Sequence, residues 1–320
     1  MLARLQQCIT FGLLTVAVVW LAAWWRYCPV VAVVGALATL FGYTVFLAVE
    51  CMLMVGAHRG DPAPAPRPGQ VLRAWLHECV TSPRVFYWRQ PFRYRAVPDH
   101  LPADGSAEGR RGVVLVHGLF GNRGFWTPWM QRLRRSGHPF VAVSLEPVFC
   151  SIDDYAPTID AAVARLQALT GRPPVLVCHS MGGLAARAWL RRARAQGDGN
   201  AAARVHRIVT IGTPHHGTVL AHCNRGVHAL QMRPGSDWLA ALARSEPVGQ
   251  TALFDCWYSN CDHIVFPCST AALPGADNRL VAGLPHVALA FHPPLVRAVL
   301  DEVGQGGRSG EAAHLWAIPL

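Results

Sequence analysis

The chain has 320 residues, enough for one large α/β domain and an appendage, and 52% of them are hydrophobic, more than is usual in a soluble domain. All 29 basic residues are arginine, and the net charge is +10. Because the arginines are dispersed, and only residues 84–95 combine them with aromatic side chains, the charge argues against a nucleic-acid-binding protein and favours juxtamembrane and surface arginine. The absence of lysine and the abundance of Ala, Gly and Pro indicate the coding bias of a GC-rich bacterial genome.

Two uncharged apolar stretches, residues 5–25 and residues 27–49, lie next to each other at the N-terminus. At about 1.5 Å per residue, each is long enough to cross a hydrocarbon core of about 30 Å. A second span directly after the first favours a helical hairpin over a cleaved signal peptide. We therefore predict a two-helix transmembrane anchor over residues 1–58, with a tight turn at residues 27–29. Its interfacial aromatic belt comprises Trp20, Trp24, Trp25 and Tyr27.

The arginines that flank the two spans predict an orientation. Arg4 precedes the first span, and Arg59, Arg67 and Arg73 follow the second, whereas Arg26 alone lies in the connection. The positive-inside tendency then places both ends, and the globular part that follows, in the cytoplasm at the bacterial inner membrane. A single uncleaved anchor with an exported domain is the alternative.

A proline-rich segment, residues 59–69, predicts a stiff linker between the anchor and the globular part. Residues 70–110 should lead into the domain as an amphipathic helix followed by an edge strand. The helix, over residues 70–80, could lie on the membrane surface or pack on the domain. The arginine-rich aromatic stretch 84–95 would suit a membrane-facing strand or a domain edge.

From residue 111 to residue 303, apolar strand-like runs alternate with helix-forming segments. Strands are expected at residues 113–116, 140–144, 175–178, 207–211 and 253–259, and helices at residues 126–135, 159–169, 184–194 and 294–303. Runs without polar alternation are typical of strands that are buried on both faces of a parallel sheet. The pattern predicts an α/β fold with a doubly wound, mostly parallel sheet.

The third of these runs ends in a serine. Ser180 stands between an apolar strand and a helix-forming stretch, and Gly182 and Gly183 follow it. This order resembles G-x-S-x-G, in which a sharp turn lifts the serine hydroxyl out of the sheet at a helix N-terminus. Cys178 occupies the place of the first glycine. We expect Ser180 to be the nucleophile of a covalent acyl transfer.

The first buried strand ends in His117 and Gly118, which is where this kind of fold builds half of an oxyanion hole. The expected donors are the backbone N–H groups of Leu119 and Met181, with Phe120 in place of Leu119 if the turn is looser. His117, Gly118, His179 and Gly182 should support the turn.

An acid and a base should follow at the ends of later strands. Asp262 follows the strand at residues 253–259 and is preferred over Asp255, which falls in mid-strand. His286 lies in a loop near the last sheet position and is the expected base. His263 is too close to Asp262 in sequence to bind its carboxylate from across a loop. His292 is possible as the base but lies one turn too far along the chain. Two other histidines, His215 and His216, should shape the pocket together with His179.

The ordered set of His117-Gly118, His179 to Gly183, Gly212 to Thr218, Asp262 and His286 resembles the bacterial α/β-hydrolase lipases and esterases. The triacylglycerol-lipase-like branch is the most similar, and residues 231–236 also look like that branch. The resemblance covers about residues 111–303 and implies an α/β-hydrolase fold, a Ser-Asp-His triad and carboxylic ester hydrolysis.

Residues 218–250 form a long connection with many apolar side chains, which suggests a lid over an acyl pocket or ordinary helical packing. The three cysteines near the proposed acid, Cys256, Cys261 and Cys268, could form a disulfide or remain free thiols. Residues 304–320 are expected to be a C-terminal tail.

These observations favour a membrane-anchored serine ester hydrolase, a lipase or esterase acting on an acyl ester or lipid. An acyltransferase with the same triad and a non-catalytic membrane-bound partner-binding module are the alternatives. We expect no cofactor, no metal and no nucleic-acid partner.

Overall fold

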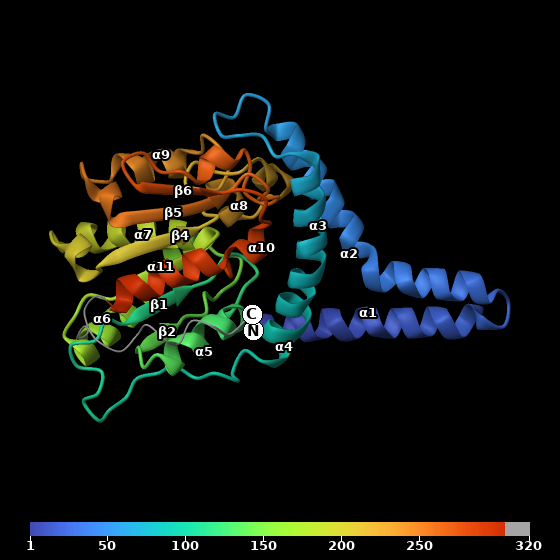
Figure 1. Cartoon of the computed structure of the whole chain (residues 1–320), viewed down its shortest axis with the longest axis horizontal. Helices are drawn as coiled ribbons and strands as arrows, with labels where there is room; N and C mark the ends of the chain where they lie inside the picture. The colour runs from blue at the N-terminus through green and yellow to red at the C-terminus, as the bar shows by residue number, and fades with distance from the viewer. Residues whose placement is uncertain (305–320) are drawn as a thin grey trace.

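A six-stranded sheet, all of whose paired strands run parallel, forms the centre of the protein (Figure 1). The computed structural model describes residues 1–304. The sheet order is β2-β1-β3-β4-β5-β6, so the chain starts inside the sheet, moves to one edge and then crosses back to the other. This order confirms the predicted doubly wound α/β fold. The strands are β1 (Val113–Val116), β2 (Phe140–Ala142), β3 (Val175–His179), β4 (Arg207–Ile211), β5 (Phe254–Ser259) and β6 (Asp277–Val281).

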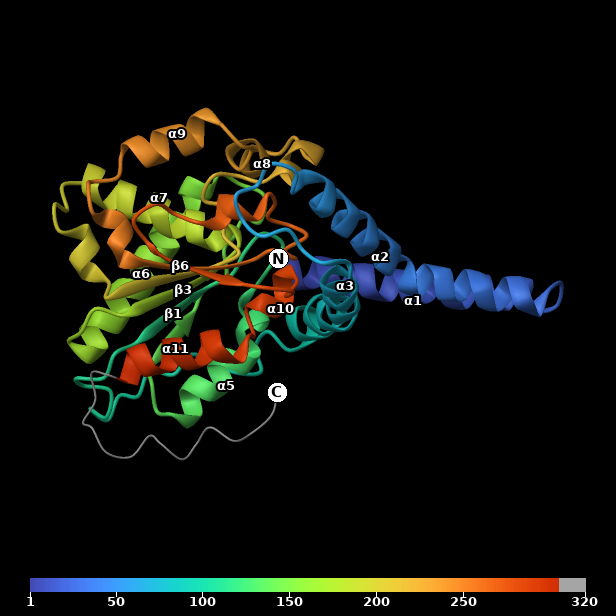
Figure 2. The same cartoon turned by 45° about the horizontal axis from the view of Figure 1, so that its top comes forward.

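Helices cover both faces of the sheet, as the unbroken apolar strands require. Successive residues of β1, Val113 and Val114, point into two separate apolar cores on opposite faces of the sheet. Figure 2 shows α5 (Thr127–Arg135) and α11 (Pro293–Gly304) on one face. On the other face lie α6 (Ala156–Thr170), α7 (Met181–Ala195) and α9 (Asp237–Arg244). The loops that carry the predicted site residues lie at the carboxyl ends of the strands.

At the N-terminus, α1 (Leu2–Trp25) and α2 (Pro29–Ala57) are antiparallel neighbours that project together from the domain (Figure 1). Both are long and apolar enough to cross a membrane, and little of either is buried in the protein. The larger and polar buried side chains lie at the ends near the domain, among them Leu2 and Gln6 of α1, and Glu50 and Met54 of α2. Farther out, three small residues are buried: Ala17, Ala32 and Ala36. The hairpin therefore has an apolar part that projects from the domain and a short part that packs on the domain.

Helix α3 (Pro68–Pro83) follows the linker and packs along α2 and the domain. The prediction of an edge strand within residues 70–110 is wrong for residues 84–92. The π-helix η1 (Arg84–Arg89) and the short α4 (Gln90–Phe92) continue the helix there, and the β contact in this stretch is a single bridge from His100 to Phe140. Aromatic residues favour strands only weakly when packing offers an alternative. Pro83 lacks the N–H that a regular helix would use, and the wider π turn begins just after it.

The connection predicted as a possible lid, residues 218–250, has both exposed and buried apolar side chains. Val219 and Leu230 are exposed, whereas Met232, Leu239 and Leu242 pack into the core. All ten cysteines are free, including the three near Asp262. Residues 305–320 of the predicted tail lie outside the described residues. The remaining elements are η2 (Arg123–Trp126), η3 (Ile152–Tyr155), η4 (Ala201–Arg204), η5 (Val219–Cys223), α8 (Val227–Gln231), η6 (Gln250–Leu253), η7 (Cys268–Ala271) and α10 (His286–Leu289).

Candidate active site

Ser180 occupies the sharp turn between β3 and α7. Its backbone has φ 55° and ψ −131°, a left-handed conformation that is rare for a residue with a side chain. The turn is held because Ser180 N–H donates to the Ile211 carbonyl at 2.8 Å and Thr213 Oγ1 donates to the Ser180 carbonyl at 2.9 Å. The surrounding structure thus maintains the strain that presents the hydroxyl above the end of the sheet.

The two positions that flank the serine in the motif differ in what they require. A Cβ at Gly182 would lie 2.7 Å from the His117 carbonyl oxygen and 2.8 Å from that of Val116, so only glycine fits there. Cys178, by contrast, is an ordinary strand residue whose side chain packs into the apolar core. The departure from G-x-S-x-G therefore falls where this fold has room for a side chain.

The turn after β1 approaches Ser180 closely. A Cβ at Gly118 would lie 2.6 Å from the Ser180 Cβ, which explains the need for glycine there. Phe120 in the same turn has φ 57°, a second strained position. His117 Nδ1 donates to the Gly118 carbonyl at 2.8 Å, and its Nε2 accepts the Leu145 N–H at 2.9 Å. The His117 ring thus ties the turn to the segment after β2.

Asp262 and His286 come together from separate loops at the carboxyl end of the sheet. Their Oδ2 and Nδ1 atoms are 2.8 Å apart, and both side chains are buried. Asp262 Oδ1 accepts the N–H groups of Ile264 and Val265 at 2.9 and 2.8 Å, which fixes the carboxylate. His286 is the first residue of α10, whereas the sequence predicted a loop position.

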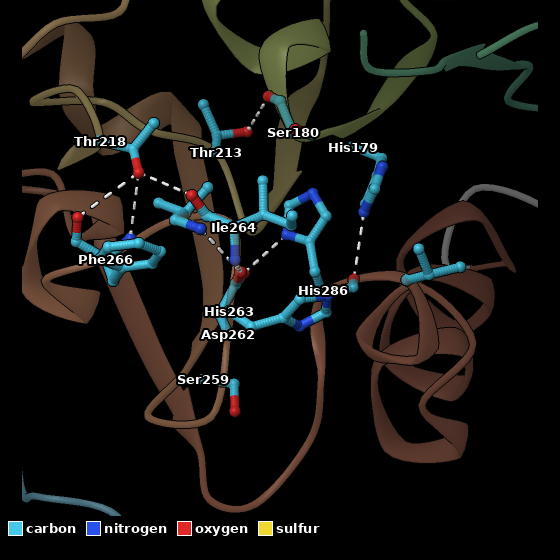
Figure 3. A network of polar contacts seen from close by, with 12 residues as sticks. His179, Ser180, Thr213, Thr218, Ser259, Asp262, His263, Ile264, Phe266 and His286 are labelled. Carbon is cyan, nitrogen blue, oxygen red and sulfur yellow. Dashed lines mark hydrogen bonds and ion pairs between the residues drawn. The ribbon is translucent and has the colours of Figure 1, made fainter. Parts of the chain in front are cut away.

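The other ring nitrogen of His286 points toward Ser180 (Figure 3). No hydrogen bond joins the Ser180 hydroxyl to the His286 imidazole, and both residues belong to the described part of the chain. Such contacts often tighten only when substrate binds. Burial lowers the pKa of His286, but the charge and hydrogen bond of Asp262 outweigh this effect and raise it above its ordinary value.

The other candidates lie elsewhere. Asp255 faces Arg207 at 3.8 Å, and His292 packs against Trp257. His179 Nε2 donates to the His286 carbonyl at 3.2 Å, so it helps to hold the backbone of His286 in place. Two other histidines in this region, His215 and His263, are buried, whereas His216 is exposed.

Comparison with known proteins shows the family to which this chain belongs. Residues 113–315 match the model of the alpha/beta hydrolase family. The chain belongs to the alpha/beta hydrolase family. A comparison with curated protein sequences found no significant match.

Solved structures of similar fold include two lipases. The mature form of the lipase BlEst2 from Bacillus licheniformis is 17% identical, with a TM-score of 0.52, over 64% of this chain and 95% of that one. Lipase B from Aspergillus fumigatus is 18% identical, with a TM-score of 0.55, over 68% of this chain and 58% of that one. At this identity the likeness concerns the fold.

This hydrolase also carries buried acidic groups that the sequence did not point out. Glu50 of α2 and Glu78 of α3 approach His263 Nε2 at 3.7 and 3.8 Å, and all three side chains are almost fully buried. Glu78 also accepts the Val287 N–H at 3.2 Å, directly after His286. Burial raises the pKa of Glu78 to about 7. The sequence does give one indication of Glu50, since it is the first charged residue after the apolar span 27–49.

A second contact joins the hairpin to the turn after β1. Gln6 of α1 donates to Gln90 Oε1 at 2.6 Å and to the Phe120 carbonyl at 3.3 Å. Asn122 Nδ2 donates to the Gln90 carbonyl at 3.1 Å. Both ends of the hairpin therefore contact loops that carry predicted site residues.

Within residues 1–304, one trio lies close enough to suggest a metal site: His58, Asp61 and Cys268, with ligand atoms within 4.8 Å of one another. Asp61 Oδ2 faces His58 Nδ1 at 3.5 Å, whereas Cys268 Sγ faces the opposite nitrogen, Nε2, at 4.0 Å. The trio joins the end of α2 to the loop beyond Asp262.

The buried histidines predict that the folded protein loses stability as the pH falls below about 6.5. Burial lowers the pKa of His117 to about 4, and those of His179 and His215 well below the ordinary value. In the unfolded chain these groups titrate near pH 6.5, so the unfolded state binds more protons below that pH and the free energy of unfolding falls. His117 alone should cost roughly 2 kcal/mol at pH 5.

Thermal unfolding in neutral detergent between pH 7.5 and pH 4.5 measures this effect. The midpoint should fall steadily below pH 6.5, and less steeply in His215→Gln. The matched control, His222→Gln at an exposed histidine, should behave as the wild type. A midpoint that is constant from pH 7.5 to pH 5 would contradict the prediction.

Proposed function

We propose that this alpha/beta hydrolase is a membrane-anchored serine ester hydrolase that cleaves acyl esters through Ser180, Asp262 and His286. The observation that carries the proposal is the 2.8 Å hydrogen bond from His286 Nδ1 to Asp262, which leaves the other nitrogen facing a strained serine. An imidazole that is held on one side and free on the other is the arrangement that a serine nucleophile requires.

In the proposed reaction, His286 Nε2 takes the proton of the Ser180 hydroxyl while Oγ attacks the ester carbonyl carbon. Asp262 holds the proton on Nδ1 and stabilises the imidazolium that forms. The oxyanion accepts hydrogen bonds from the N–H of Met181, at the start of α7, and from that of Leu119, or of Phe120 as the alternative. The imidazolium then protonates the leaving alcohol, and water releases the acid by the same steps.

The setting of the site supports an apolar acyl substrate. The hairpin of α1 and α2 is long enough to cross a membrane and contacts the site at both of its ends near the domain. The two similar solved structures described above are named lipases. We propose a lipid or acyl ester as substrate, a lid within residues 218–250, and the cytoplasmic face of a bacterial inner membrane as the location.

Covalent labelling tests the nucleophile directly. A fluorophosphonate probe should phosphonylate the Ser180 hydroxyl with loss of fluoride, and peptide mapping should find the adduct at that residue. Acid-denatured protein should remain unlabelled, and Ser245→Ala, at a serine after α9, should label at the wild-type rate. An adduct at any other residue, or none in folded protein, would overturn the assignment.

A further inference from the structure

A pocket of about 440 Å³ lies on the surface between η1, α4 and α5, away from Ser180. Arg84, Trp88, Arg89 and Arg93 line one side of it. Thr127 and Gln131 of α5 also line the pocket and add polar atoms, and its other lining residues are Ala96, Val97 and Pro128. The pocket thus combines a basic wall with polar and apolar side chains.

The three arginines of this pocket have no anionic partner. Nearby, Arg123 pairs with Asp99 at 2.8 Å, as surface arginines commonly do. Within residues 1–304, by contrast, the guanidinium groups of Arg84, Arg89 and Arg93 form no ion pair and no hydrogen bond with the protein. Residues 79–98 contain no acidic residue. In the described part of the chain, the wall therefore carries positive charge that no carboxylate neutralises.

Arg89 is partly buried, whereas Arg84 and Arg93 are exposed. Its guanidinium lies over the Phe291 ring at 5.5 Å from the ring centre. Burial, and then the neighbouring charge of Arg84, lower the pKa of Arg89. An anion in the pocket would relieve both effects, because a guanidinium group binds a phosphate with two parallel hydrogen bonds.

The pocket adjoins the part of the hairpin that leaves the domain. Phe92 packs edge-on against Phe11 of α1 at 5.6 Å, and Trp88 lies 5.9 Å from Phe92. Gln7 of α1 donates to the Pro91 carbonyl at 2.7 Å. Figure 1 shows α4 beside the domain end of α1. If the apolar stretch of α1 spans a membrane, these arginines lie at the level of the lipid headgroups, and exposed Trp88 lies at the interface.

We propose that this pocket binds the phosphate of an anionic phospholipid in the membrane that the hairpin enters. The proposal rests on the membrane anchoring in the proposed function, but not on the catalytic chemistry. A lipid fits better than a free phosphate, because the basic wall continues into an aromatic surface formed by Trp88, Phe92 and Phe11. Basic pockets beside membrane helices are typical binding sites for such headgroups.

Native mass spectrometry of the full chain in neutral detergent tests the proposal with dioleoyl-phosphatidylglycerol as the probe. The wild type should retain this lipid in preference to dioleoyl-phosphatidylcholine. The double variant Arg89→Gln/Arg93→Gln should bind phosphatidylglycerol about 30-fold more weakly, at about 1 kcal/mol for each lost charge. Inorganic phosphate at millimolar concentration should displace little of the lipid.

The matched control is Arg165→Gln/Arg297→Gln, which removes two exposed arginines of the domain and changes the net charge equally. It should bind the lipid as the wild type does, and circular dichroism should show both double variants folded. Equal lipid binding by the pocket variant and the control, or equal retention of phosphatidylcholine, overturns the proposal. Full displacement by inorganic phosphate assigns the pocket to a free anion and overturns the lipid. Alkaline extraction of membranes tests the anchoring separately.

Discussion

Replacing Ser180 by alanine is expected to lower kcat for hydrolysis of p-nitrophenyl acyl esters by about 10⁶-fold, close to the limit of detection. Without Oγ no acyl-enzyme can form, and the remaining groups can only polarise the ester and orient water. Alanine should also relieve little strain, because it too carries a Cβ at a backbone φ of 55°. The protein should therefore stay folded with its turn unchanged.

Steady-state kinetics in detergent micelles, with thermal unfolding as the check on folding, measure this result. Ser180→Cys provides a companion variant, since it keeps a nucleophile and should react with thiol reagents at that site. Turnover by Ser180→Ala within tenfold of the wild type would remove Ser180 from the mechanism and favour a non-catalytic role for the triad.

Replacing Asp262 by asparagine should lower kcat/KM by about 10⁴-fold. The amide oxygen can still accept the N–H groups of Ile264 and Val265, so the loop should keep its shape. The amide nitrogen would then face His286 Nδ1 and donate to it. This places the imidazole proton on Nε2, where it cannot accept the proton of Ser180.

The same substitution should change the pH dependence. The wild-type kcat/KM should rise with pH through the raised pKa of His286, because only the neutral imidazole acts as a base. In Asp262→Asn that pKa should fall, so the residual activity should reach its plateau at lower pH. Asp255→Asn is the matched control, since this acid faces Arg207 and should leave the kcat/KM and its pH profile unchanged. Equal losses in the two variants would contradict the assignment.

The central part of the candidate site could be predicted because it depends on local rules. A turn from a buried strand into a helix needs a small residue at Gly182, and the close approach of the turn after β1 needs one at Gly118. Parallel strands deliver their carboxyl ends to one edge of the sheet, so Asp262 and His286 were expected there. The structure brings these two side chains into hydrogen-bond contact.

Other features depend on contacts between distant segments and left little trace in the sequence. Glu50, Glu78 and His263 are far apart along the chain but meet behind His286. The stretch after Pro83 has the composition of an edge strand and yet stays helical, because it packs against α1 and α3. Gln6 lies within an apolar span, and its side-chain amide donates a hydrogen bond to the Phe120 carbonyl in the turn after β1.

The sequence by itself therefore determined the alternation of strands and helices, the serine turn and the two apolar N-terminal helices, since each follows from the spacing of apolar, small and polar residues over a few turns. Only the tertiary structure decided that Cys178 is an ordinary core residue, that the hairpin packs on the candidate site, and that three arginines share one pocket. Those outcomes depend on which surfaces meet after folding, and burial free energy is gained only when the complementary segment is in place.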